Sequence, residues 1–535
     1  MTNFISLKRI VIILLVIFTF QSAAQNADES DGKPVENKFL NWYNKSPRFD
    51  TIYGADVERA YTDLLSNKES KTVIVAVIDG GVDITHEDLK DNIWVNEDEI
   101  PGNNMDDDQN GYIDDIHGWN YLGNDKGENI SHENLEITRV YKQYNNKSQL
   151  KDKEKELYKK AKKSYEKELK RAKMQKNGVV KYKNKYFTSY NKIIEELDGK
   201  EMSLSNLDSL RNCNKELKKD IRFIYPFIQY GFKTEIFDEA ENHFDEILNY
   251  HLNIDFNPRE IIGDNVEELT PGYGNNNVYG PEADHGTFVS GIIAAKRNNN
   301  LGINGVASDV KIMALKTVPN GDERDKDVAN AIRYAVDNGA RIINMSFGKE
   351  LSPQKHLVDE AALYAEKNGV LIVHAAGNDA SDNDKILNYP EKYINNNIAI
   401  DTWITVGAST IKNDYKFVAN FSNYGKKSVD LFAPGVDIYS LKPESEYETA
   451  GGTSFSSPIV SGVAALIMSY YPELSAKEVK EIILNSVNYY GENDVYLPGP
   501  DSKKRKTTKF KDLSVTGGLV NAYKAIELAE SYHKK

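Results

Sequence analysis

The sequence predicts an α/β fold in which a mostly parallel central sheet lies between two layers of helices. Short apolar and β-branched runs, the pattern of buried strands, recur at 73–78, 310–318, 341–347, 370–376, 404–408 and 429–433. Helical patterns separate several of them, at 287–296, 325–338 and 357–368. Strands that alternate with helices are typical of a parallel sheet covered on both faces. The 535 residues are 40 % hydrophobic and 10 % aromatic, which is enough to bury such a core.

Charge and cysteine content exclude several classes of protein. The formal net charge is −14, whereas a general nucleic-acid binder needs a basic surface. Cys213 is the single cysteine, so the chain forms no internal disulfide and no cysteine-based metal site. We therefore expect no nucleic-acid partner.

The first 24 residues predict a signal peptide. Lys8 and Arg9 precede an apolar run over 10–20, and small residues end the segment at Ala24, where we expect cleavage. The alternative is an uncleaved membrane anchor, but the run is shorter than the roughly 20 residues that a span needs. We expect a secreted or periplasmic protein with no transmembrane segment after signal removal, and residues 25–48 form an N-terminal segment.

Residues 49–138 predict the first part of the main domain and a candidate metal loop. Acidic or amide side chains alternate before a glycine, as in loops that bind Ca²⁺ through hard oxygen ligands. The expected ligands of a structural calcium ion are Asp106, Asp108, Asn110, Tyr112 (through its carbonyl) and Asp114. His117 stands where an EF-hand loop has its bidentate glutamate, and a plain Asp/Asn-rich turn is the alternative.

Residues 139–252 predict a charged helical insertion. Lysine and glutamate dominate from 151 to about 176, with a narrow apolar stripe at Leu150, Leu157, Ala161, Tyr165, Leu169 and Ala172. Further helical patterns lie at 190–217 and 234–252. The charged run is explained by a solvated helix face, and binding of a partner or a lid function is the alternative. The Gly-, Asn- and Pro-rich segment 271–284 returns the chain to the main domain, whose second part is expected at 253–528, followed by a tail at 529–535.

Three segments carry residues suited to chemistry. Asp79 follows the strand 73–78, at the edge where parallel sheets place their sites. His285 lies in the first turn of the next predicted helix, and Ser454 opens the long apolar helix 454–471 after two glycines. Taken singly, an ordinary turn, a structural histidine and a helix cap explain them as well. The helix after 471 is expected to be capped by Ser475 and to run to Val487.

Together and in this order, the three segments resemble the subtilisin-like serine proteases, the subtilase family or peptidase family S8. Asp79 matches the aspartate motif of that family, His285 its His-Gly-Thr motif and Ser454 its Gly-Thr-Ser motif. The resemblance covers roughly 49–137 and 253–528 and implies a three-layer subtilisin-like fold. In this chemistry Ser454 is the nucleophile, His285 the general base and acid, and Asp79 the carboxylate that orients the imidazole.

The resemblance also implies an oxyanion hole and a substrate-binding segment. Asn378, after the strand 370–376, matches the side-chain donor of the oxyanion hole, beside the backbone N–H of Ser454. Residues 344–348 are similar to the family strand with which an extended peptide substrate pairs. One wall of the first pocket would be lined by Ser346, Phe347 and Gly348, and the other by Ala375, Ala376 and Gly377.

These observations favour an exported serine endopeptidase that acts on peptide or protein substrates through an acyl-enzyme. Departures from the common family motifs, at Gly80, Phe288, Ser290 and Ser456, remove no proton-transfer group. Two alternatives stay open. One is a secreted binding protein on an inactive subtilase scaffold, and the other is a transpeptidase that ligates peptide ends.

Overall fold

The computed structural model describes residues 40–269, 272–394, 398–500 and 505–534. The predicted signal peptide and the first part of the segment 25–48 lie outside these residues. The described residues divide into two compact units, of which one comprises Ile137–Phe256 and the other residues 40–136 together with those from Asn257 onward. None of the helices in the described ranges combines the length and apolar character needed to cross a membrane.

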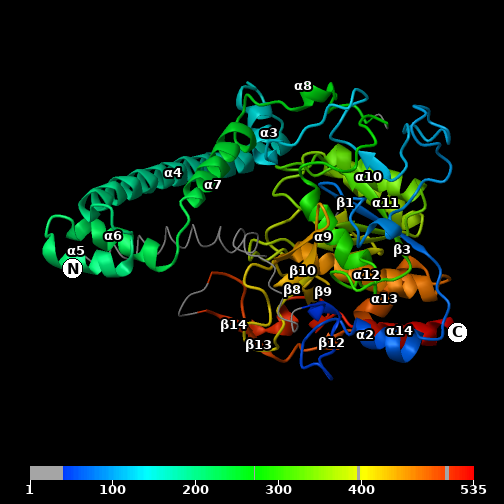
Figure 1. Ribbon diagram of the computed structural model, residues 1–535. Helices are drawn as coiled ribbons and strands as arrows, with labels where there is room; N and C mark the ends of the chain where they lie inside the picture. The colour runs from blue at the N-terminus through cyan, green and yellow to red at the C-terminus, as the bar shows by residue number, and fades with distance from the viewer. Residues whose placement is uncertain (1–39, 270–271, 395–397, 501–504, 535) are drawn as a thin grey trace. The chain divides into compact units, whose positions relative to one another are not determined.

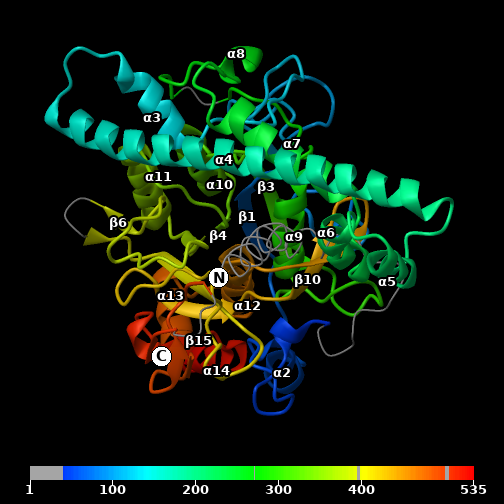
Figure 2. The ribbon, with the colours of Figure 1, turned by 90° about the vertical axis from the view of Figure 1, so that its left-hand side faces the viewer.

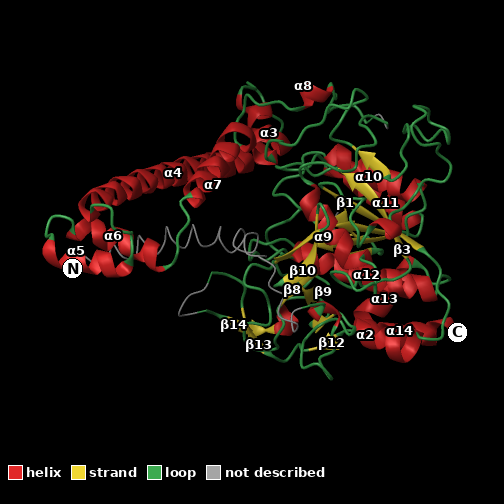
Figure 3. Cartoon of the chain, viewed as in Figure 1, coloured by secondary structure: helices red, strands yellow, loops and turns green. Residues whose placement is uncertain are grey.

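In the described part of the larger unit, nine strands form one sheet in the order β12-β15-β9-β8-β5-β4-β1-β3-β2. All neighbours are parallel except β12 and β15. The strands are β1 (Val73–Asp79), β2 (Gly118–Asn120), β3 (Val310–Lys316), β4 (Ile342–Met345), β5 (Leu371–Ala375), β8 (Trp403–Ser409), β9 (Leu431–Pro434), β12 (Asn488–Tyr489) and β15 (Gly518–Leu519). The α/β class is confirmed, and each of the six predicted strands lies in this sheet (Figure 3).

Helices cover both faces of the sheet because successive residues of a strand point to opposite faces. Val73, Val75 and Val77 of β1 pack into one apolar core with α9 (Ala283–Ala294) and α12 (Thr453–Tyr470). Ala76 and Ile78 pack into a second core with α10 (Asp325–Asp337) and α11 (Lys355–Lys367). Figure 2 shows α10 and α11 on one side of β1 and α9 on the other. The structure is thus the expected three-layer subtilisin-like arrangement.

Several helix boundaries follow their capping residues. Ser475 caps α13 (Ala476–Asn485) as predicted, since its hydroxyl accepts the N–H of Glu478 and the Glu478 carboxylate accepts the N–H of Ser475. The helix α9 begins at Ala283, four residues before the helical pattern at 287–296, and His285 lies in its first turn as predicted. The last helix, α14 (Ala522–His533), buries Ala529, so the predicted boundary between 528 and 529 falls inside a packed helix.

The unit 137–256 is helical. Its elements are α3 (Glu136–Asn145, which starts one residue earlier), α4 (Asp152–Leu197), α5 (Leu204–Cys213), α6 (Lys218–Gln229), α7 (Glu235–Glu246) and η4 (Ile247–His251). Both α6 and α7 pack on α4, and Figure 1 shows α7 alongside it. The buried residues Tyr165, Ala172, Val179, Tyr186 and Ile193 recur every seventh position of α4. The expected helical segment at 190–217 is therefore wrong in its bounds, because α4 continues to Leu197 and a separate helix, α5, follows.

The remaining elements are short. Trp42 and Tyr43, which precede the predicted start of the main domain at 49, are fully buried in the core around β1. The other elements are η1 (Trp42–Asn44), α2 (Val57–Arg59), η2 (Ala60–Leu65), η3 (Lys90–Asn92), α8 (Arg259–Ile262), β6 (Tyr393–Ile394), β7 (Ile398–Ala399), β10 (Ile438–Lys442), β11 (Glu446–Ala450), β13 (Asp494–Tyr496), β14 (Thr507–Lys509) and η6 (Phe510–Asp512).

Candidate active site

An aspartate and a histidine from distant segments meet at the carboxyl edge of the sheet. Asp79 is the last residue of β1 and is almost fully buried. The Nδ1–H of His285 donates to both of its carboxylate oxygens, at 2.8 Å and 3.0 Å. Because Nδ1 carries the proton in this arrangement, Nε2 of the neutral imidazole is left as a proton acceptor.

A glycine allows this close approach. A Cβ on Gly286 would lie 2.1 Å from the carbonyl oxygen of Gly81 and 3.1 Å from Cβ of Asp79. The first turn of α9 therefore rests directly on the turn that follows β1. Any larger residue at 286 would push His285 away from Asp79.

The environment of His285 favours its protonated form. Desolvation lowers the pKa of His285, but the charge of Asp79 and its hydrogen bond outweigh this effect and hold the pKa above the ordinary value of 6.5. The side chain is 39 % exposed, so one side of the ring faces outward. The ring of Phe455, the residue after Ser454, lies 5.7 Å from the imidazole, centroid to centroid.

Ser454 is the second residue of α12 and is partly exposed. Its hydroxyl donates to the carbonyl oxygen of Ser346 at 3.0 Å. Within the described residues, the hydroxyl is thus bonded to the Ser346 carbonyl and not to His285. The structure brings Asp79 and His285 together and leaves the expected link from His285 to Ser454 unformed in this rotamer.

Asn378 lies in the loop after β5, and its amide is fixed by the start of α12. Its Oδ1 accepts the backbone N–H of Thr453 at 2.9 Å and the Thr453 hydroxyl at 3.0 Å. The amide nitrogen, Nδ2, lies 3.6 Å from where a Cβ on Gly452 would stand. With the oxygen held by Thr453, Nδ2 of Asn378 lies near Gly452, two residues before Ser454.

The two predicted pocket walls are held by different contacts. Ser346 is buried, and its Oγ donates to the carbonyl of Ser454 at 2.8 Å. On the other wall, Ala375 and Ala376 are buried, and the N–H of Gly377 donates to the Thr453 hydroxyl at 3.1 Å. The carbonyl of Ala376 accepts N–H groups from three side-chain amides, those of Asn383, Asn388 and Asn423.

Asn388 lies between these walls and was missed by the sequence analysis. Its amide is within 2.7 Å of where a Cβ on Gly348 would stand, and its Nδ2 is 3.2 Å from the equivalent point on Gly377. It comes from a loop ten residues after Asn378. Since no motif or hydrophobic period marks this loop, no signal in the sequence points to Asn388.

Comparisons with known proteins identify the family of this chain. A family model described as the subtilase family, Peptidase_S8, matches residues 70–511. The chain belongs to the subtilase family. It is 37 % identical over 219 residues to subtilisin DY of Bacillus licheniformis, which covers 40 % of this chain and 74 % of that protein. It is 36 % identical over 244 residues to thermitase of Thermoactinomyces vulgaris, covering 45 % and 75 %. This subtilase is therefore a serine-type endopeptidase.

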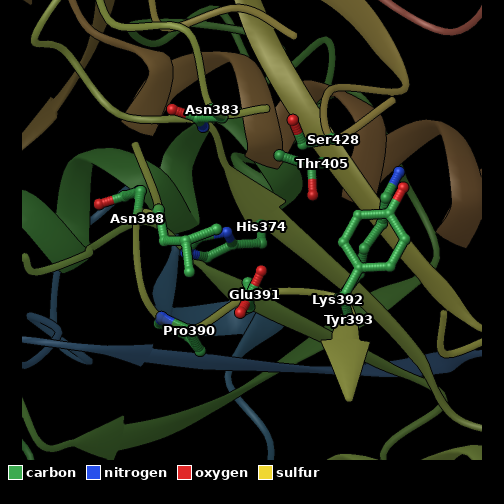
Figure 4. Close-up of a pocket in the computed structure, with 10 residues that line it drawn as sticks. His374, Asn383, Asn388, Pro390, Glu391, Lys392, Tyr393, Thr405 and Ser428 are labelled. Carbon is green, nitrogen blue, oxygen red and sulfur yellow. The ribbon is translucent and has the colours of Figure 1, made fainter. Parts of the chain in front are cut away.

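A buried histidine supports the first wall of the pocket in this subtilase. The Nε2–H of His374 donates to the carbonyl of Phe347 at 2.8 Å, and burial lowers the pKa of His374 to about 4. The imidazole is thus a neutral donor at neutral pH. It lines a cavity of about 20 Å³, which is room for about one water molecule, together with Asn388, Glu391 and Lys392 (Figure 4).

The predicted ligands in the candidate metal loop of the subtilase fall into two groups with different contacts. Carboxylate oxygens of Asp106 and Asp108 lie within 4.8 Å of one another and of Glu99. The carboxylate of Asp114 instead accepts backbone N–H groups of residues 102, 103 and 104. The side-chain oxygen of Asn110 accepts the N–H of Tyr112. Glu99 was missed because it precedes the alternating pattern by seven residues.

Proposed function

We propose that this subtilase hydrolyses peptide bonds with Ser454 as nucleophile, His285 as general base and acid, and Asp79 as the orienting carboxylate. The observation that carries the proposal is the pair of hydrogen bonds from Nδ1 of His285 to both oxygens of the buried Asp79. Such a contact fixes the tautomer in which Nε2 can take a proton, and it stabilises the imidazolium once the proton has moved.

The proton transfer begins with a rotation of the serine hydroxyl. Turning about the Cα–Cβ bond of Ser454 moves Oγ from the carbonyl of Ser346 towards Nε2 of His285. Oγ then attacks the scissile carbonyl carbon while its proton passes to Nε2. The imidazolium gives this proton to the leaving amine, which leaves an ester on Oγ. A water molecule hydrolyses the ester with His285 acting again as base.

The negative charge of the tetrahedral intermediate is stabilised by two donors. Nδ2 of Asn378 and the backbone N–H of Ser454 act on the oxyanion, and the amide orientation imposed by Thr453 supports this role. Ser454 also stands in the first turn of an 18-residue helix, α12, whose positive dipole end favours the same charge.

The substrate is an extended peptide that lies along residues 346–348. Ser346, Phe347 and Gly348 form one wall of the first pocket, and Ala375, Ala376 and Gly377 form the other. The amide of Asn388 between them supports a pocket with a polar contact at its base. The basic and apolar pattern of residues 1–24 supports export of the chain to the periplasm or the medium.

A peptidase assay on the full chain, with Ser454→Ala as control, tests this function. The wild type should release p-nitroaniline from a tetrapeptide p-nitroanilide, and Ser454→Ala should fall to the background rate. Equal rates for the two chains would instead favour a binding protein on an inactive scaffold. Mass spectrometry of the products separates hydrolysis from transpeptidation, which would give ligated peptides.

We further propose a structural calcium ion at Glu99, Asp106 and Asp108. Three carboxylates within 4.8 Å repel one another, and hard oxygen donors of this kind suit Ca²⁺. Excess calcium should raise the thermal unfolding midpoint above its value in chelator, and Glu99→Gln should reduce the difference. An equal midpoint in calcium and in chelator would refute the site.

A further inference from the structure

A lysine directly after the substrate-binding segment is almost fully buried. Lys349 follows Gly348, and its side chain is 1 % exposed. Burial of an ammonium group is unfavourable unless acceptors replace the lost water. The contacts of Lys349 therefore indicate what this charge does in the fold.

Three acceptors from two other segments surround the ammonium. Nζ lies 2.8 Å from Oε2 of Glu136, 2.8 Å from Oδ1 of Asp325 and 2.8 Å from the carbonyl oxygen of Glu323. An ammonium group has three N–H donors, so these contacts match its capacity. Glu136 is the last residue of its compact unit before the helical insertion, and Asp325 begins α10.

The backbone of Lys349 carries this restraint to the other side of the pocket. Its N–H donates to the carbonyl of Tyr389 and its carbonyl accepts the N–H of Tyr389, both at 2.9 Å. Tyr389 follows Asn388, the residue between the two pocket walls. A fixed position of Lys349 thus fixes the end of one wall together with the loop that carries Asn388.

The segment 346–348 needs such a restraint because the sheet does not hold it. β4 ends at Met345, which is also the last residue of that strand to pair with β5. Across the described residues, the N–H and carbonyl of Gly348 make no hydrogen bond. These groups remain available to a substrate backbone, and their position depends on the anchored residues on either side, Phe347 through His374 and Lys349 through its acids.

We propose that Lys349 is a positioning residue for the peptide substrate. Its ammonium, held by Glu136 and Asp325, fixes residues 346–348 so that they pair with an extended chain. This inference rests on the proposed function, since it assumes that the peptide lies along that segment. A buried apolar residue would stabilise the fold equally well, so the charge of Lys349 serves to fix the position of the backbone rather than to add stability.

The test compares two substrates and uses a variant in which Lys349 and its two paired carboxylates are all made neutral. Lys349→Met alone removes the cation beside the buried carboxylates of Glu136 and Asp325 and can unfold the chain. The main variant therefore combines Lys349→Met with Glu136→Gln and Asp325→Asn in the full-length protein. The substrates are a tetrapeptide p-nitroanilide, which needs the segment, and p-nitrophenyl acetate, which reaches Ser454 without it.

A matched control comes from a second buried lysine. Lys326 is also 1 % exposed and binds the carboxylate of Asp264 and two backbone carbonyls. The pair Lys326→Met with Asp264→Asn removes a comparable ionic contact from another part of the same unit. Lys349→Arg tests rescue by a residue that keeps the charge.

We expect the triple variant to lose about tenfold or more in kcat/KM on the tetrapeptide, mainly through KM, because uniform binding is lost. Its kcat/KM on p-nitrophenyl acetate should stay within about twofold of the wild type. The Lys326 control should keep both activities, and Lys349→Arg should recover part of the KM.

Three results would overturn the inference. An unchanged KM on the tetrapeptide in a folded triple variant shows that the segment is positioned without Lys349. Parallel losses on both substrates with a lower unfolding midpoint show a purely structural role. A wild-type chain inactive on both substrates refutes the proposed function, and the positioning role falls with it.

Discussion

The oxyanion side chain gives the sharpest test of the proposed mechanism. We expect Asn378→Leu, which keeps the branching of the side chain but removes its N–H donor, to lower kcat and to leave KM nearly unchanged. The donor acts on a charge that exists only in the transition state, so the ground-state complex does not depend on it.

The structure also sets the expected order of effects. Loss of one oxyanion donor typically costs about 2.7–4 kcal/mol, or about 10²–10³ in kcat. Thr453→Val keeps Asn378 but removes the hydroxyl that donates to its Oδ1 and accepts the N–H of Gly377. Two hydrogen bonds of about 1 kcal/mol each limit this loss to about 2 kcal/mol, or about 30-fold. Thr453→Ser keeps the hydroxyl and should resemble the wild type.

The assay measures kcat and KM on a tetrapeptide p-nitroanilide. Active enzyme is counted by titration with a fluorophosphonate that reacts with Ser454, so misfolded protein does not enter kcat. The expected order of kcat is wild type and Thr453→Ser, then Thr453→Val, then Asn378→Leu. A kcat for Asn378→Leu within threefold of wild type would refute the assignment of the donor. Equal losses in Thr453→Val and Asn378→Leu would refute the argument that the hydroxyl only orients the amide.

Two further predictions concern charge. Asp79 holds the pKa of His285 above 6.5, and only the neutral imidazole accepts the serine proton. We therefore expect kcat/KM to fall on acidification with a midpoint above pH 6.5. A midpoint below pH 6 in the pH–rate profile would contradict this expectation. The buried guanidinium of Arg259 pairs with Glu133, Asp264 and Asp327, so Arg259→Met should lower the free energy of unfolding by about 3–5 kcal/mol. Urea unfolding measures this loss, and a change below about 1 kcal/mol would show that the acids find other partners.

The strand pattern allowed the sheet to be predicted from sequence. In β1, Val73, Val75 and Val77 pack into one core, whereas Ala76 and Ile78 pack into the other. Both faces of the sheet therefore had to be covered by helices. The aspartate at its end then lies at the carboxyl edge, where parallel strands place their side chains. The histidine and serine motifs were recognisable because each begins a helix within a glycine-containing segment.

The helical insertion contains a periodic pattern that extends beyond the predicted segments. The seven-residue spacing of Tyr165 and Ala172 continues through Val179, Tyr186 and Ile193. Continuing it predicts one helix rather than two. α6 was not predicted, because Pro226 lies inside it. It forms where Ile224 and Phe227 pack into the same apolar cluster as Tyr186.

The sequence by itself determined the α/β class and the positions of the buried strands along the chain, and it predicted Asp79, His285 and Ser454 as the catalytic residues. These features rest on local periods and short motifs, which neighbouring residues along the chain carry. Only the tertiary structure decided that Asn388 lies between the pocket walls, that Glu99 joins Asp106 and Asp108, and that Lys349 is anchored by acids from two other segments. Such contacts join loops with no period of their own, and the packing of the whole sheet sets the distance between them.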